Sequence, residues 1–282
     1  MTVTGRRAAL FAAVAAIGLL AISCASGPRP PQPGTPAFYW GAANEMFRAG
    51  NYLKTNDNLA QITRSDNEFA ARAQPFELVV SAGLAQGFYD LAENYELGAR
   101  ANRANPTPFR KQVNISRGYA SNLSLQFTEA FHRFRLSNKD ANIALAFGYP
   151  TGNASMPPQI KRVTSGIFVQ DSEREEIQKA VLQRGVLLSV CRAIGAPDNP
   201  AKALEVFQKG EVQVPAAVFF FAMAKALEEQ SQLFAPIKLD QPVRMQLLSN
   251  EALAALKLVP PSKEVKDLTG KIEKTLKKVK PT

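Results

Sequence analysis

The sequence contains few of the side chains from which metal centres and nucleophilic active sites are built. Its 282 residues include one histidine, His132, and two cysteines, Cys24 and Cys191. A structural zinc site takes about four ligands, chiefly from cysteine and histidine, and a catalytic dyad needs a base beside its nucleophile. A glycine-rich phosphate loop is also lacking, because the segment 148–152 contains Pro150 and no lysine follows it. We therefore expect neither an enzyme nor a cofactor.

The remaining candidate catalytic groups have structural explanations. Glu129 and His132 form a Glu-x-x-His pair, which ligates iron in di-iron helical bundles, but such a site needs a second pair and hence a second histidine. Cys191 lies in an apolar stretch, where a lone thiol behaves as a small buried hydrophobe. Several acids are explained by a helix start, where the helix dipole favours them: Asp171, Glu173, Glu175 and Glu176. We expect no metal site and no catalytic residue.

The chain does contain enough apolar material for a folded core. Hydrophobic residues make up 46% of the sequence and charged residues 21%, a balance that excludes wholesale disorder. The formal net charge is +10. Such a surface attracts polyanions and anionic lipid head groups without specificity, and salt weakens that attraction.

The first 24 residues have the order of a secretory signal. Arg6 and Arg7 are followed by an uncharged apolar run of 15 residues and then, after small residues, by Cys24. A membrane-spanning helix needs about 20 apolar residues, so a cleaved signal peptide over 1–23 fits better than a stable anchor. The segment LAISC, which ends at Cys24, resembles the lipobox of bacterial lipoproteins. The alternative is an uncleaved anchor helix with an incidental cysteine.

The lipobox resemblance implies that Cys24 is lipidated and becomes the first residue of the mature chain. Two or three acyl chains hold a protein at the membrane far more firmly than one. Residues 24–36 contain five prolines and predict an extended tether. Ala25 favours the outer membrane over the inner membrane, by resemblance to enterobacterial sorting. In the envelope we expect a protein partner and no nucleic acid. The excess of basic residues over acidic ones is then explained by solvated helix faces or by contact with the membrane.

Beyond the tether, apolar residues recur at spacings of three and four, which predicts an all-helical body. One helix is expected over about 37–49, ended by Gly50, and a second from Tyr52. A similar arrangement follows 37 residues later, where Gly87 and Tyr89 correspond to Gly50 and Tyr52. The sequence therefore predicts antiparallel helix pairs with glycine at the turns.

This pattern resembles the tetratricopeptide repeat, a helix-turn-helix unit of about 34 residues with Gly-x-Tyr at its turn. The large and small positions of the first unit are filled by Tyr39, Ala42, Ala43, Met46, Gly50, Tyr52, Leu59 and Ile62. The resemblance covers about residues 36–102 and implies stacked antiparallel helix pairs. The alternative is an ordinary helical bundle whose turns use glycine.

A loop rich in glycine and proline, residues 148–158, predicts a boundary between two lobes. We expect an N-terminal helical lobe over 37–148, an irregular connector over 149–170 and a C-terminal lobe over 171–282. Its last helix, 262–280, has one apolar stripe and a lysine-rich opposite face, as expected of a helix that caps a repeat array. The stripe consists of Val265, Leu268, Ile272, Leu276 and Val279.

Two functions remain open. The first is a lipid-anchored envelope scaffold whose helical-repeat surface binds another protein or a peptide, because stacked helix pairs present extended surfaces. The second is a solute-binding or transporter-accessory lipoprotein with a pocket between the two lobes, near residues 148–160.

The anchor can be tested at Cys24. Replacing its thiol with a hydroxyl, Cys24→Ser, removes the acceptor for the acyl chains, so metabolic labelling with a radioactive fatty acid should be lost and the unprocessed precursor should accumulate. A mutant that is still acylated and processed normally would show that the segment is not a lipobox.

Overall fold

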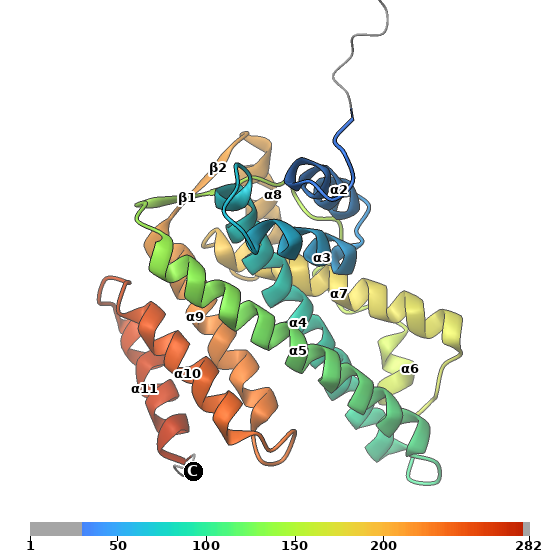
Figure 1. Cartoon of the computed structure of the whole chain (residues 1–282). Helices are drawn as coiled ribbons and strands as arrows, with labels where there is room; N and C mark the ends of the chain where they lie inside the picture. The colour runs from blue at the N-terminus through green and yellow to red at the C-terminus, as the bar shows by residue number, and fades with distance from the viewer. Residues whose placement is uncertain (1–29, 279–282) are drawn as a thin grey trace, which may run out of the picture.

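A computed structural model describes residues 30–278, and helices make up 70% of them. The predicted all-α class is therefore confirmed (Figure 1). Among the described residues, none of the helices combines the length and the apolarity that a membrane crossing requires. Cys24 and the predicted signal peptide lie outside the described residues.

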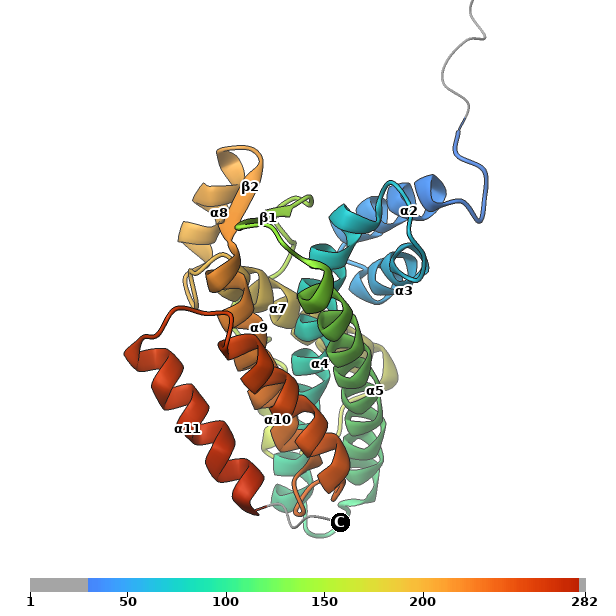
Figure 2. The ribbon, with the colours of Figure 1, turned by 60° about the vertical axis from the view of Figure 1, so that its left-hand side comes forward.

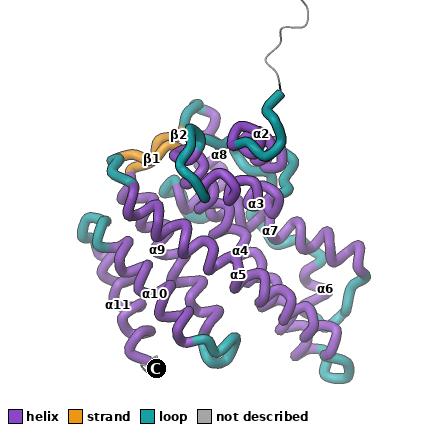
Figure 3. The backbone as a smooth tube through the Cα atoms, in the orientation of Figure 1, coloured by secondary structure: helices purple, strands orange, loops and turns teal. Residues whose placement is uncertain are grey.

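The helices follow one another through short connections and, in one place, through a small sheet (Figure 3). Their bounds are α2 Pro36–Arg48, α3 Tyr52–Thr63, α4 Ala70–Ala101, α5 Thr107–Ser137, α6 Ile160–Thr164, α7 Asp171–Ala193, α8 Pro200–Gln208, α9 Ala216–Ser231, α10 Pro242–Leu256 and α11 Lys263–Lys278. A 3-10 turn, Gln232–Phe234, follows α9.

The first predicted helix pair is confirmed as the α2–α3 hairpin. Gly50 ends α2 with a positive φ of 70°, a conformation that favours glycine, and the Asn51 side chain accepts a hydrogen bond from the backbone N–H of Lys54 at the start of α3. Phe47 and Tyr52 are buried with ring centroids 5.0 Å apart. The turn therefore brings the two helices together through aromatic packing.

The second predicted pair is wrong, because α4 runs without interruption through Gly87. Both Gly83 and Gly87 lie against α7, where a Cβ on Gly83 would stand 2.5 Å from the Cα of Val186. A Cβ on Gly185 of α7 would stand 2.3 Å from the carbonyl oxygen of Gly83. These glycines permit two helices to cross closely, and none of them makes a turn.

A two-stranded antiparallel sheet interrupts the helical pattern, which the sequence analysis did not predict. Strand β1, Asn142–Leu145, pairs with β2, Val212–Pro215, so that Asn142 lies opposite Pro215 and Leu145 opposite Val212. Each strand has four residues, too few for an alternating pattern to stand out. The sheet joins the end of α5 to the start of α9.

Helix α4 is the centre of the molecule. It packs against α5 on one side and α7 on the other, and also contacts α3, α6 and α9 (Figure 2). One continuous buried cluster contains residues of both predicted lobes, such as Phe76 of α4, Val186 of α7 and Phe219 of α9. The core is therefore shared across the predicted boundary.

The predicted connector, residues 149–170, is irregular apart from α6. It crosses the surface of the earlier helices and is held there by hydrogen bonds. Tyr52 donates its hydroxyl hydrogen to the carbonyl oxygen of Thr151 over 2.7 Å, and the Asn102 side-chain amide donates to the carbonyl oxygen of Gly166 over 3.0 Å.

The predicted C-terminal helix is present as α11 and packs against α10 and α9. Ile272 is fully buried, while the other described members of the stripe are partly buried against the core: Val265, Leu268 and Leu276. Val279 lies outside the described residues. On the same helix, Lys271 Nζ lies 2.8 Å from the buried carboxylate of Glu228 in α9.

The close crossing of α4 and α7 can be tested with alanine. Gly185→Ala should lower the free energy of unfolding by about 1–3 kcal/mol, because its methyl group would overlap the backbone of α4. Gly118→Ala is the matched control, since Gly118 is an exposed glycine of α5 with nothing near its Cβ position. That change should raise the free energy of unfolding by up to about 1 kcal/mol. Urea denaturation measures both, and equal effects at the two positions would contradict the close crossing.

Candidate functional site

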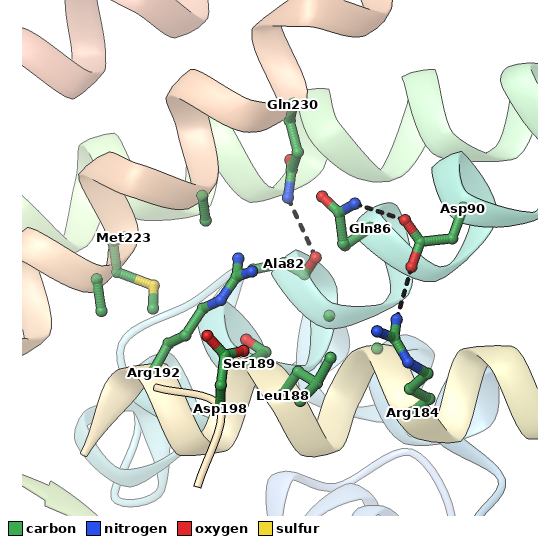
Figure 4. A pocket seen from close by; sticks show the side chains of 14 residues that line it. Ala82, Gln86, Asp90, Arg184, Leu188, Ser189, Arg192, Asp198, Met223 and Gln230 are labelled. Carbon is green, nitrogen blue, oxygen red and sulfur yellow. Dashed lines mark hydrogen bonds and ion pairs between the residues drawn. The ribbon is translucent and has the colours of Figure 1, made fainter. Parts of the chain in front are cut away.

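A small polar pocket of about 180 Å³ lies where α4, α7 and α9 meet (Figure 4). Its lining residues come from these three helices and from the loop before α8: Ala82, Gly83, Gln86, Asp90, Arg184, Gly185, Leu188, Ser189, Arg192, Asp198, Ala222, Met223, Ala226 and Gln230. Many of them are polar, although the surrounding core is apolar. Buried polar groups are costly unless they are paired, so each of them calls for an explanation.

Helical spacing brings the polar side chains to one place. Gln86 and Asp90 are four residues apart on α4, and Arg184 and Arg192 are eight apart on α7, so each pair lies on one helix face. Gln230 extends from α9 toward the other two helices (Figure 4). Small residues of α9, Ala222 and Ala226 among them, leave the space between these faces open.

One wall of the pocket is an ion pair between α4 and α7. Arg184 Nη1 lies 2.9 Å from Asp90 Oδ2, and the Gln86 amide donates to Asp90 Oδ1 over 2.8 Å. Arg184 Nε also donates to the carbonyl oxygen of Ala154 over 2.8 Å. Burial raises the pKa of the Asp90 carboxyl, and the Gln86 hydrogen bond and the charges of Arg184 and Arg192 oppose that rise.

The second wall carries Arg192 and Asp198. Arg192 Nη1 lies 2.5 Å from Glu229 Oε2, and this is the one hydrogen bond that its guanidinium makes to any residue between 30 and 278. Its Nε and Nη2 donate no hydrogen bond to any residue in that range. Asp198 is an exposed residue that also lines the pocket, has a positive φ of 58° and forms no ion pair with another described residue.

Gln230 is the least satisfied of the buried polar groups in the pocket. The residue is 2% exposed, and its side-chain nitrogen donates to the carbonyl oxygen of Ala82 over 3.1 Å. Its side-chain oxygen, Oε1, is buried and receives no hydrogen bond from the described part of the chain. An unsatisfied buried acceptor costs about 1–3 kcal/mol.

The residues examined as catalytic candidates lie elsewhere. Cys191 is fully buried, and burial raises the pKa of its thiol to about 11, so it is a packed core residue as expected. His132 Nδ1 lies 2.9 Å from Glu251, which also pairs with Arg135, so His132 is satisfied by a partner. Within residues 30–278, no group of three or more His, Cys, Asp or Glu side chains is arranged to hold a metal ion.

The pocket is not where the sequence analysis expected one. Residues 148–160 contribute the carbonyl oxygen of Ala154 to Arg184, but the lining itself comes from α4, α7, α9 and Asp198. The sequence analysis missed Gln86, Asp90 and Gln230. A usable signal was present, because acids and amides interrupt otherwise apolar helices at these positions.

Comparison with protein-family models, with curated proteins and with solved structures finds no match to this chain. No relative therefore supplies a function, a substrate or a site residue. The function has to be inferred from the chemistry of the pocket and from the sequence.

The ion pair across the pocket can be tested with a double-mutant cycle. Asp90→Asn and Arg184→Gln should show a coupling energy of about 1–3 kcal/mol in urea denaturation, because the two groups are largely buried and hydrogen-bonded. The control pair is Asp171 and Arg174 on the first turn of α7, where the Asp171 side chain is 88% exposed, so the same exchanges should give less than about 0.5 kcal/mol. Equal coupling for the two pairs would contradict a buried, structured wall.

Proposed function

We propose that the protein is a lipid-anchored envelope protein that binds a small polar solute in the pocket between α4, α7 and α9. The observation that carries this proposal is a polar recess between three helices whose lining includes the buried amide of Gln230, of which only the nitrogen is hydrogen-bonded to the described part of the chain. In a pocket that served packing alone, an apolar side chain would avoid the cost of burying this amide.

The size and chemistry of the pocket support a small ligand. Pockets for drug-sized molecules have volumes of about 300–1,000 Å³, and this one has about 180 Å³. Its lining combines an apolar side, formed by Leu188, Met223 and the alanines of α9, with a few convergent polar groups. Small-molecule sites have this composition, in which apolar contacts give area and polar groups fix the orientation.

The anchor and the location belong to the same proposal and rest on sequence. A lipidated Cys24 and the proline-rich tether over 24–36 would hold the body close to the membrane, with the outer membrane favoured over the inner one by Ala25. The tether joins the folded body at the start of α2 (Figure 1). A solute-binding body held there would serve as an accessory to a transport system.

A second candidate is the protein-binding scaffold, and one surface favours it. A groove of about 540 Å³ lies between the α2–α3 turn and α7, lined by Met46, Tyr52, Leu53, Leu182 and neighbouring residues. However, α2–α3 is followed by α4 and α5, of 32 and 31 residues, so the described helices do not continue as pairs of the repeat length. The extended concave face of a repeat array therefore does not support this candidate.

Native mass spectrometry of the full chain, purified from envelopes in mild detergent, tests the first proposal. The wild-type protein should retain a small molecule, and Ala226→Leu should lose it, because three added carbons would occupy much of the pocket. Ala71→Leu is the matched control, an exposed alanine at the start of α4. It should retain the ligand.

Thermal unfolding of both variants must show that they are folded. A wild-type protein without any bound small molecule, together with a stoichiometric protein partner that is lost on Leu53→Glu, would contradict solute binding and favour the scaffold.

A further inference from the structure

Another pocket, of about 440 Å³, lies beside the turn between α4 and α5, at the end of the molecule away from α2 (Figure 1, Figure 2). We call it the arginine pocket, because three of the six residues that line it are arginines. They come from the last turn of α4, from the turn itself and from the first turn of α5: Arg100, Arg103 and Arg110. The other three are Glu96, Ala99 and Pro106.

Close packing at the turn brings the two helix ends together. Gly98 lies against the buried ring of Phe109, so closely that a Cβ on Gly98 would stand 2.6 Å from Phe109 Cδ1. The turn is fixed by Asn102, whose side-chain nitrogen donates to the carbonyl oxygen of Gly166 over 3.0 Å and whose side-chain oxygen accepts from the backbone N–H of Asn105 over 2.9 Å. The helix ends that carry two of the three arginines are therefore held side by side.

Acidic side chains do not balance the positive charge of the arginine pocket. Residues 97–128 contain four arginines and one lysine but neither aspartate nor glutamate. Glu96 is the one acid in the lining. Its Oε1 lies 3.3 Å from Arg100 Nε and its Oε2 lies 3.6 Å from Arg117 Nη2, so its single charge is already shared between two guanidinium groups.

The other two arginines of the lining are open to a ligand. Arg103 and Arg110 are exposed, and neither side chain forms an ion pair or a hydrogen bond with another residue between 30 and 278. Like charges gathered in one pocket repel one another, and an anion among them offsets that repulsion. Guanidinium groups bind phosphate through two parallel N–H···O bonds, a geometry that lysine does not provide.

We propose that the arginine pocket binds a phosphate monoester, whose phosphate group is held by Arg103 and Arg110 with Arg100 beside them. Such a group carries a charge of about −1.5 to −2 at pH 7 and three acceptor oxygens, so it can accept from more than one guanidinium. The pocket volume lies within the range of small-molecule sites, about 300–1,000 Å³, which leaves room for the organic part of the ligand. The arginine pocket shares no lining residue with the pocket between α4, α7 and α9, so this site goes beyond the proposed function.

Isothermal titration calorimetry of the full chain in detergent, at constant ionic strength, tests this inference with defined probes. The soluble monoesters are glycerol 3-phosphate and glucose 6-phosphate, and the lipid monoester is dioctanoyl phosphatidate. The comparison probes are dimethyl phosphate and acetate. We expect at least one monoester to bind with one ligand per chain and both comparison probes to bind at least about tenfold more weakly, because each carries a single negative charge.

Matched pairs of substitutions separate a site from general attraction by positive charge. Arg103→Gln combined with Arg110→Gln removes two charges from the arginine pocket and should weaken binding of the best monoester at least about tenfold. Arg48→Gln combined with Arg72→Gln is the control, because both residues are exposed, lie outside the lining and form no ion pair with another described residue. It removes the same charge and should bind normally.

A third double variant keeps the charge and changes the geometry of the donors. Arg103→Lys combined with Arg110→Lys should weaken binding at least about threefold, because an ammonium group lacks the planar fork of the guanidinium. All the substituted side chains are exposed, so the variants should melt at the temperature of the wild type.

The outcomes also identify the source of the phosphate. Binding of a soluble monoester assigns a soluble ligand, whereas binding of dioctanoyl phosphatidate alone assigns a lipid head group. Failure of all three monoesters, or comparison probes that bind as tightly as the best monoester, would overturn the inference. So would a glutamine variant no weaker than its control, or a lysine variant that binds as the wild type does. Ala226→Leu should leave phosphate binding unchanged, so failure of the proposed solute site is recognised separately.

Discussion

The rest of this structure depends on the close contact between the backbones of α4 and α7. At the crossing, a Cβ on Gly185 would come within 2.3 Å of the Gly83 carbonyl oxygen, so neither helix could carry a side chain there without moving away. Gly87 extends the contact toward Leu182 by one turn. Because α4 also packs against α5 along much of its length, the crossing joins the earlier and later parts of the chain in one core.

The same crossing accounts for the pocket. Two helices that approach so closely carry their larger side chains away from the contact, and the faces beside it meet α9 across small residues such as Ala226. Arg184 is thereby held within hydrogen-bond distance of Asp90 on the neighbouring helix. The pairing satisfies these two groups. A surface made by close packing thus becomes a polar recess.

Two buried acids elsewhere in the molecule are, like Asp90, paired with basic side chains of other helices. Glu228 of α9 is 1% exposed and is reached by Lys271 from α11, and Glu251 of α10 is paired with Arg135 from α5. Each of these pairs links helices that are distant in sequence. Removing one partner of such a pair leaves a buried charge, which costs more than the pair itself contributes. Gln230 differs from these two acids in that its Oε1 receives no hydrogen bond from the described part of the chain, a state that it shares with six other buried side-chain atoms there.

The helical class, the α2–α3 hairpin, the start of α7 and the amphipathic α11 follow from the sequence alone, because all of these depend on local spacing and on local turn residues. It did not distinguish Gly50 from Gly87, although both precede a Tyr at the same spacing. Gly50 ends a helix with a positive φ, whereas Gly87 lies inside α4 because α7, almost a hundred residues later, packs against it. The four-residue strands and the pocket were likewise decided by tertiary structure. Pairing of β1 with β2, and of Asp90 with Arg184, joins residues 67 or more positions apart, and only the folded packing of the helices brings such groups together.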